Sequence, residues 1–153
     1  MTPRTVFVSK APGLMKRLIE RYEVVDFQAA GAAGNLGHES NGFTQLHELG
    51  QPAGRGGYGW AQWTGPRRKT FFDWCHTHNL DWTSDEGNIS YLLHELDGDS
   101  KIIAALLKTK NLEEATISFE RNFERAGVVN MASRNKWAQI ALDAYRGGLP
   151  HAA

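Results

Sequence analysis

The chain has 153 residues, of which 41% are hydrophobic and 22% charged, and this composition is typical of a folded globular protein. Lys and Arg total 17 and Asp and Glu total 17, so the formal net charge is zero, which argues against a nucleic-acid-binding protein with a global positive field and against a polybasic membrane-surface protein. The one cysteine, Cys75, excludes an intramolecular disulfide and a zinc site built on several cysteines.

Two helices are predicted at the start of the chain. Pro12 is a favourable helix start, and apolar residues follow it at helical spacing on one face, namely Leu14, Met15, Leu18, Ile19 and Tyr22. A second helix is expected from Asp26 toward Gly37, with an interior of small side chains. Glycine costs about 1 kcal/mol relative to alanine inside a helix. These glycines therefore indicate that a neighbouring helix approaches closely, and we expect 26–37 to be a buried central helix.

A Gly-rich segment follows, because ten of the 16 glycines lie between Gly31 and Gly65. Residues 40–66 are predicted as loops with a small hairpin. Five more helices are expected, over 67–78, from Thr83 with Glu86 as a capping box, over 100–107, from the cap Asn111 to a stop at Gly127, and over 133–146. The predicted fold class is mainly α (α+β), with about seven helices and a small Gly-rich lobe near 40–66, in a single domain spanning 1–153.

Glu39 is the first candidate catalytic residue. It is expected at the C-terminal end of the apolar second helix, near the negative pole of the helix dipole and against apolar walls. Both effects disfavour a charged carboxylate, so this carboxyl is expected to hold a proton near neutral pH and to be able to donate it to a leaving oxygen. The alternative is an ordinary surface glutamate at a helix end.

A second stretch, 56–68, places three aromatic residues beside glycines and a single amide, Gln62. The aromatic residues are Tyr58, Trp60 and Trp63. Flat aromatic faces and an adaptable Gly backbone suit stacking against sugar rings, and Gln62 can hydrogen-bond hydroxyl or amide groups. The alternative for each tryptophan is a place in the core of a packed loop. The set, close after Glu39, favours a glycan-binding cleft.

The two motifs together resemble the phage tail-type lysozymes and, more broadly, the lysozyme-like superfamily that includes goose-type lysozymes and lytic transglycosylases. The resemblance rests on Gly-Asn-Leu-x-x-Glu-Ser at 34–40 and Gly-Tyr-Gly-Trp-Ala-Gln-Trp-Thr-Gly at 57–65, followed by Arg67 and Arg68. The late stretch 119–124, with Arg134 opening a final helix, also resembles the C-terminal part of that family.

This resemblance implies a lysozyme-like fold and cleavage of the β-1,4 bond between N-acetylmuramic acid and N-acetylglucosamine in peptidoglycan. Glu39 would then be the proton donor, and Ser40 would support the helix end or the carboxylate. The sugar sites would be lined by Gln62, Tyr58, Trp60 and Trp63, with Thr64 as a helper for water or substrate.

The second carboxylate is less clearly marked. Glu48 lies nine residues after Glu39, an interval at which other phage lysozymes place an acidic residue, usually Asp, followed by a Thr where this chain has Gly54. Glu48 is therefore a candidate catalytic partner, with a solvated loop glutamate as the alternative. A glycosidase with two carboxylates holds them about 5–5.5 Å or about 6.5–9.5 Å apart. Lytic transglycosylases work with one Glu, let the substrate's own hydroxyl attack and leave an anhydro sugar.

No metal or cofactor is expected, because His76 and His78 point in different directions on a helix and no other metal-binding spacing is present. The expected partner is the glycan strand of peptidoglycan, bound by a monomer, with no nucleic acid and no membrane insertion. With no secretory signal visible, we expect the protein in the host cytoplasm until its release to the wall, or associated with a virion tail. Two alternatives stay open: a lytic transglycosylase, and a non-catalytic glycan-binding or virion structural module.

Overall fold

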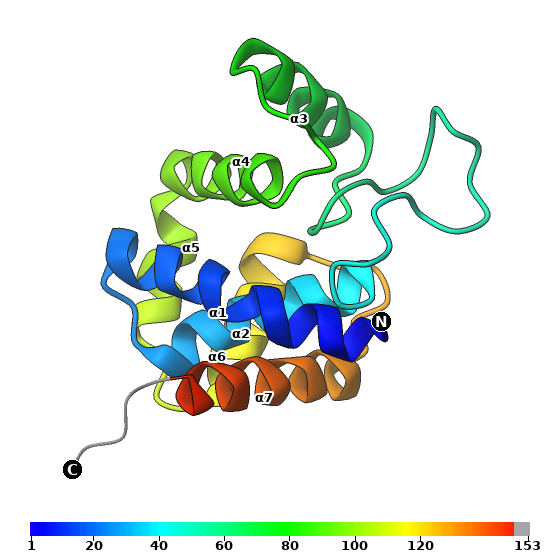
Figure 1. Cartoon of the computed structure of the whole chain (residues 1–153). Helices are drawn as coiled ribbons and strands as arrows, with labels where there is room; N and C mark the ends of the chain where they lie inside the picture. Colours follow the sequence, from blue (N-terminus) through cyan, green and yellow to red (C-terminus); the bar gives the residue numbers. More distant parts are fainter. Residues whose placement is uncertain (149–153) are drawn as a thin grey trace.

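The computed structural model describes residues 1–148 and is mainly helical (Figure 1). Its elements are α1 (Pro3–Tyr22), α2 (Asp26–Ser40), α3 (Gly65–Thr77), α4 (Asp85–Gly98), α5 (Ser100–Leu107), α6 (Leu112–Phe119), the π-helical turn η1 (Glu120–Glu124) and α7 (Met131–Gly147). Within this range, strand-like pairing consists of two isolated antiparallel bridges, His47 with Tyr58 and Tyr58 with Trp63. The mainly α fold class, the seven α-helices and the Gly-rich loop lobe are thus confirmed. Residues 149–153, the end of the predicted domain, lie outside the described range.

Two helix starts differ from the prediction. The first helix begins at Pro3 instead of Pro12, because Thr2 caps it by accepting the Thr5 N–H at 3.1 Å. Helix α4 is capped by Ser84, whose Oγ accepts the Gly87 N–H at 2.9 Å. The predicted cap, Thr83, instead donates its hydroxyl to Asp81 Oδ1 at 2.7 Å. In both places a side chain other than the predicted one accepts a free backbone N–H of the first turn.

The predicted helix from Asn111 to Gly127 is interrupted. Its cap is confirmed, since Asn111 Oδ1 accepts the Glu114 N–H at 2.9 Å. However, the α-helical part ends at Phe119, one π turn follows, and Arg125 stops the helix in a left-handed conformation with φ of 50°. The chain therefore leaves the helix before Gly127, and α7 starts at Met131, two residues before the predicted start.

Helix α2 lies at the centre of the larger group of helices, in contact with α1, α6 and α7 (Figure 1). Its glycines permit this packing. A Cβ on Gly31 would lie 2.8 Å from the backbone of Ala115 in α6, and one on Gly34 would lie 2.5 Å from Cα of Ala138 in α7. The expected close approach of neighbouring helices and the buried central position of α2 are both confirmed.

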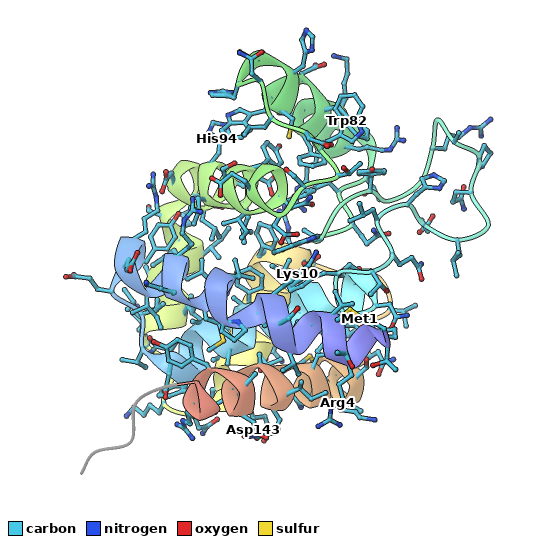
Figure 2. All side chains as sticks on the ribbon, in the orientation of Figure 1. Met1, Arg4, Lys10, Trp82, His94 and Asp143 are labelled. Atoms are coloured by element: carbon cyan, nitrogen blue, oxygen red, sulfur yellow. The ribbon has the colours of Figure 1, made fainter. Side chains whose placement is uncertain are left out.

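The second group, which we call the α3–α4 lobe, contains the loop 41–64, α3 and α4. Its core is aromatic, with the Trp63 ring 4.6 Å from that of Phe71 and 5.0 Å from that of Tyr91, and Cys75 is fully buried there. Ion pairs join this lobe to α1, such as Lys10 Nζ with Asp85 at 2.8 Å; Figure 2 labels Lys10 on α1 below the α3–α4 lobe. Among the residues that the structure describes, no helix has the length and apolar character that a membrane crossing requires.

Candidate active site

Glu39 lies one residue before the C-terminal end of α2, and its side chain is 19% exposed. Its Oε1 accepts a hydrogen bond from Nη2 of Arg134 at 2.7 Å. The Arg134 side chain is fully buried, so this is an ion pair with one side closed and one side open to solvent. The expectation of purely apolar walls around Glu39 is therefore wrong, because a buried guanidinium forms part of its surroundings.

Each of the three guanidinium nitrogens of Arg134 donates a hydrogen bond to another residue. Nε donates to the Val129 carbonyl at 2.6 Å, Nη1 donates to Asn35 Oδ1 at 3.1 Å, and Nη2 reaches Glu39. Asn35 is itself fully buried and donates its amide to the carbonyls of Gly31 at 2.9 Å and Thr116 at 3.0 Å. A planar guanidinium with a hydrogen bond from each of its three nitrogen atoms has little freedom to move. The Glu39 carboxylate is consequently fixed in position.

The antiparallel contact of α2 and α7 places these two side chains opposite each other. Gly34 packs against Ala138. Five residues further along α2 and four residues earlier in α7, Glu39 contacts Arg134. His38 and Ser133, next to this pair, also connect the two helices, with Nδ1 of His38 2.7 Å from the Ser133 hydroxyl. The absence of a side chain at Gly34 brings the two helix axes together, so the backbone packing of α2 sets the distance between the charged groups.

Ser40 supports the helix end, which is one of its two expected roles. Its fully buried hydroxyl donates to the Leu36 carbonyl at 2.8 Å and accepts the Phe43 N–H at 2.9 Å. These bonds close the last turn of α2 and start the loop that follows. Because the hydroxyl is buried and occupied in this way, Ser40 acts here through the backbone beside Glu39.

Glu124 is a second acidic residue close to this pair. The residue as a whole is half-buried, but its Oε1 is inaccessible to solvent and has no hydrogen-bond partner among residues 1–148. Its charge interacts with those of Glu39 and Arg134. Burial first, and then the negative charge of Glu39, raise the pKa of the Glu124 carboxyl well above its ordinary value of 4.5.

Glu48 lies in the hairpin of the loop 41–64. Its backbone N–H donates to the Gly57 carbonyl at 2.9 Å, and its side chain lies over Gly56, where an added Cβ would be 2.8 Å from Oε2. The side chain is half-buried. The structure thus places Glu48 on the loop that follows Glu39 along the chain, as the resemblance implies, and leaves its role as a catalytic partner a prediction.

The Gln62 side chain connects two parts of the loop 41–64 by hydrogen bonds. Its Nε2 donates to the carbonyls of Gln45 at 3.3 Å, Leu46 at 2.7 Å and Gly59 at 2.9 Å. The backbone of Gln62 is left-handed, with φ of 53°, a conformation that costs a non-glycine residue roughly 1–3 kcal/mol. The three bonds compensate for that cost. The amide nitrogen is fully engaged within the protein, so Oε1 is the amide atom that remains for a ligand.

The aromatic residues of the motif divide into buried and half-buried ones. Trp60 is 2% exposed and stacks on Phe43 with ring centres 3.8 Å apart, and Trp63 is 1% exposed. A ring inside the core cannot stack on a sugar, so the alternative of core tryptophans describes both residues and we do not assign them to sugar sites. Tyr58 is half-buried beside Phe72, and Thr64 is exposed at the start of α3.

A second guanidinium–carboxylate pair connects the loop 41–64, α3 and α4. Arg67 donates Nε to Glu95 Oε2 at 3.0 Å and Nη2 to Glu95 Oε1 at 2.9 Å. The same carboxylate accepts the indole N–H of Trp63 at 2.6 Å. Arg67 also lies over the ring of Phe123, 4.9 Å from its centre, and this contact links the α3–α4 lobe to η1.

Sequence reasoning did not assign functional roles to Arg134, Asn35 or Glu124. A signal for Arg134 exists in the sequence, because it shares a helix face with Ala138 and Ala141, and a charged residue on an otherwise apolar face requires a buried counter-charge. Asn35 likewise precedes Glu39 by one helical turn on the central helix. No local pattern marks Glu124, because its position depends on the π turn and on the packing of distant helices.

The comparisons with known proteins give one family. The model of the phage tail lysozyme family matches residues 10–145, a range that includes Glu39, Glu48, Glu124 and Arg134. No curated protein matches the chain.

Proposed function

Since the chain belongs to the phage tail lysozyme family, and thus has a lysozyme-like peptidoglycan hydrolase role, we propose that it is a muramidase with Glu39 as its general acid. The bond cleaved would be the β-1,4 linkage between N-acetylmuramic acid and N-acetylglucosamine. The observation that supports this most directly is the position of Glu39. It is a partly exposed carboxylate near the end of the central helix, and it is hydrogen-bonded to the buried Arg134.

In this proposal the solvent-facing side of Glu39 contacts the glycosidic oxygen. Glu39 donates its proton to that oxygen as the bond to the anomeric carbon breaks through an oxocarbenium-like state. Water then adds to the anomeric carbon and leaves a reducing N-acetylmuramic acid end. Correct placement of one general acid contributes about 10²–10⁴-fold to such a rate.

Glu48 is the candidate for the second carboxylate, which would stabilise the oxocarbenium-like state or activate the attacking water. Its place on the loop after Glu39 supports this, as does the hairpin bridge between His47 and Tyr58 that fixes the backbone next to it. Oε1 of Gln62, Tyr58 and the exposed Thr64 are the members of the predicted sugar-binding set that we retain.

The test is a digest of purified peptidoglycan with products identified by mass spectrometry. Wild type is compared with Glu39→Gln and Glu48→Gln, and with Glu113→Gln as a matched control, because Glu113 is exposed on α6. Glu39→Gln keeps an oxygen that can accept from Arg134 but removes its anion, so circular dichroism first establishes that the variant is folded under the assay conditions.

We expect reducing N-acetylmuramic acid ends from wild type and Glu113→Gln, and a rate at least about 100-fold lower for Glu39→Gln. Anhydro ends would identify a lytic transglycosylase and remove the role of Glu48. Cleaved peptide stems would contradict the glycosidase assignment. A Glu39→Gln variant that retained the wild-type rate would show that another residue is the acid, and no product from wild type would favour a non-catalytic glycan-binding module.

A further inference from the structure

The environment of Glu124 leaves its carboxyl without a counter-charge of its own. Its Oε1 is buried without a hydrogen-bond partner among the described residues. Two guanidiniums act on it, Arg134 and Arg67, but each is already bonded to another carboxylate, Glu39 at 2.7 Å and Glu95 at 2.9 and 3.0 Å. Three carboxyls therefore surround two guanidiniums. An overall neutral cluster requires one proton, and the carboxyl without a partner is Glu124.

The charged groups that act on Glu124 lie on four different helices. They are Glu39 on α2, Arg134 on α7, Arg67 on α3 and Glu95 on α4. On its own turn, Glu120 accepts the Ala126 N–H at 3.0 Å. His38 acts on Glu39 and Arg134, and burial followed by the charge of Arg134 lowers its pKa, so His38 is neutral at and above neutral pH.

The proposed role of Glu39 raises a question about its proton. An ion pair requires the charged carboxylate, whereas donation to the glycosidic oxygen requires the neutral acid. If Glu39 simply took up a proton from solvent, the fully buried Arg134 would lose its anion, and an uncompensated buried charge is strongly unfavourable. Arg134 therefore needs a second carboxylate nearby that can become negative when Glu39 becomes neutral.

We propose that Glu124 is that carboxyl, and that Glu39 and Glu124 form a pair that shares one proton beside Arg134. Glu124 is a positioning residue in this scheme, because it acts through Glu39 and Arg134 rather than on the sugar. The inference rests on the proposed function of Glu39. Two interacting carboxyls that hold one proton between them are a known device for keeping an acid available at a pH where an isolated carboxyl would be ionised.

The proton and charge balance at each step. In the resting state the proton is on Glu124, and the charge is on Glu39, paired with Arg134. In the reactive state the proton is on Glu39 and the negative charge on Glu124. Glu39 then gives the proton to the glycosidic oxygen as the C–O bond breaks, which leaves both carboxyls ionised beside Arg134. Water adds its hydroxide to the anomeric carbon, and its proton returns to the pair.

The first arm of the test needs no substrate. Denaturant unfolding is measured from acid to alkaline pH for wild type, Glu124→Gln and the exposed control Glu113→Gln. The folded pair keeps a proton that unfolded glutamates lose above about 4.5, so wild-type stability should fall as pH rises beyond that value. Glu124→Gln lacks this decline, and its stability advantage over wild type should appear above that pH and vanish below it. A difference that does not change with pH would overturn the proposal.

The second arm is the pH dependence of kcat for wild type, Glu124→Gln and Glu124→Asp. In Glu124→Gln no second carboxyl can become negative when Glu39 becomes neutral, so the neutral form of Glu39 leaves the buried Arg134 without an anion. Glu124→Gln should therefore lose about tenfold or more at neutral pH and recover toward the wild-type rate on the acid side. Glu124→Asp retains a carboxyl and should restore much of the neutral activity. An unchanged neutral rate in Glu124→Gln, or an equal loss at every pH, would overturn the proposal, because equal loss indicates a structural role alone.

The same measurements separate this inference from the proposed function. If wild type releases reducing ends and Glu39→Gln does not, the proposed function stands and the two arms decide the role of Glu124. If wild type releases no glycan fragment, or Glu39→Gln releases as much, the proposed function fails and the catalytic pair fails with it, whatever the unfolding data show.

Discussion

Replacing Arg134 with methionine should destabilise the protein by about 3–5 kcal/mol, the usual cost of removing one partner of a buried ion pair. Methionine occupies most of the arginine side-chain volume, so the loss arises from polar groups left without partners rather than from a cavity. Glu39 is 19% exposed, and water can solvate part of its charge. Asn35 is fully buried, and its Oδ1 loses its donor, which costs about 1–3 kcal/mol. Solvation of Glu39 lowers the expected loss of stability and the unpaired Asn35 raises it, so we keep the estimate of about 3–5 kcal/mol.

The measurement is urea unfolding followed by circular dichroism, with Arg146→Met as a matched control. Arg146 lies on the same helix and pairs with Asp26 at 3.0 Å, but it is 56% exposed, so its loss should cost no more than about 1 kcal/mol. Arg134→Lys should lie between the two, because an ammonium keeps the charge but cannot serve three acceptors in a fixed fork. A loss of 3–5 kcal/mol corresponds to a melting temperature lower by roughly 6–20 °C.

The reasoning is refuted if Arg134→Met and Arg146→Met have equal effects. A double variant refines the outcome. Arg134→Met combined with Glu39→Gln should be less destabilised than the sum of the single variants, because the neutral amide leaves no uncompensated charge. Strict additivity would show that the loss in Arg134→Met does not come from its pairing with Glu39.

Two further predictions concern packing. Gly34→Ala should lower the free energy of unfolding by about 2–3 kcal/mol, because its Cβ would lie 2.5 Å from Cα of Ala138. Gly13→Ala, whose Cβ would have nothing within 4 Å, should raise it by up to about 1 kcal/mol, and equal unfolding midpoints for the two variants would contradict the close approach of α2 and α7. Cys75 should not react with a thiol reagent in the folded protein, because it is buried and burial raises the pKa of its thiol to about 11. It should react fully in denaturant, and rapid labelling of the native protein would contradict this prediction.

Much of the fold is predictable from local patterns in the sequence, and so is the central residue of the candidate site. The small residues of 26–37 indicate a buried helix without reference to its partners, and Glu39 follows at its end. The cap Asn111 with Glu114 was equally local and is confirmed. Features of this kind depend on residues a few positions apart, which is the range over which helix periodicity and capping act.

The features that sequence patterns do not predict depend on contacts between residues far apart in the chain. Trp60 and Trp63 sit among glycines that suit a binding loop and a packed loop equally well. Trp60 packs against Phe43, and Trp63 packs against Phe71 and Tyr91. The π turn that ends the sixth helix has no capping signal. The partner of Glu39 is Arg134, 95 residues away, and a pairing over that separation follows from helix packing and not from spacing.

The separation between Glu39 and Arg134 also has a consequence for synthesis. At about 5–20 residues per second, a ribosome makes Arg134 roughly 5–20 s after Glu39. During that interval α2, rich in glycine and without the α7 backbone against Gly34, lacks the packing that fixes its carboxylate. A nascent chain is therefore incapable of fixing the Glu39 carboxylate against Arg134 until α7 is made. Under the proposed function of Glu39, the activity therefore depends on the synthesis of α7.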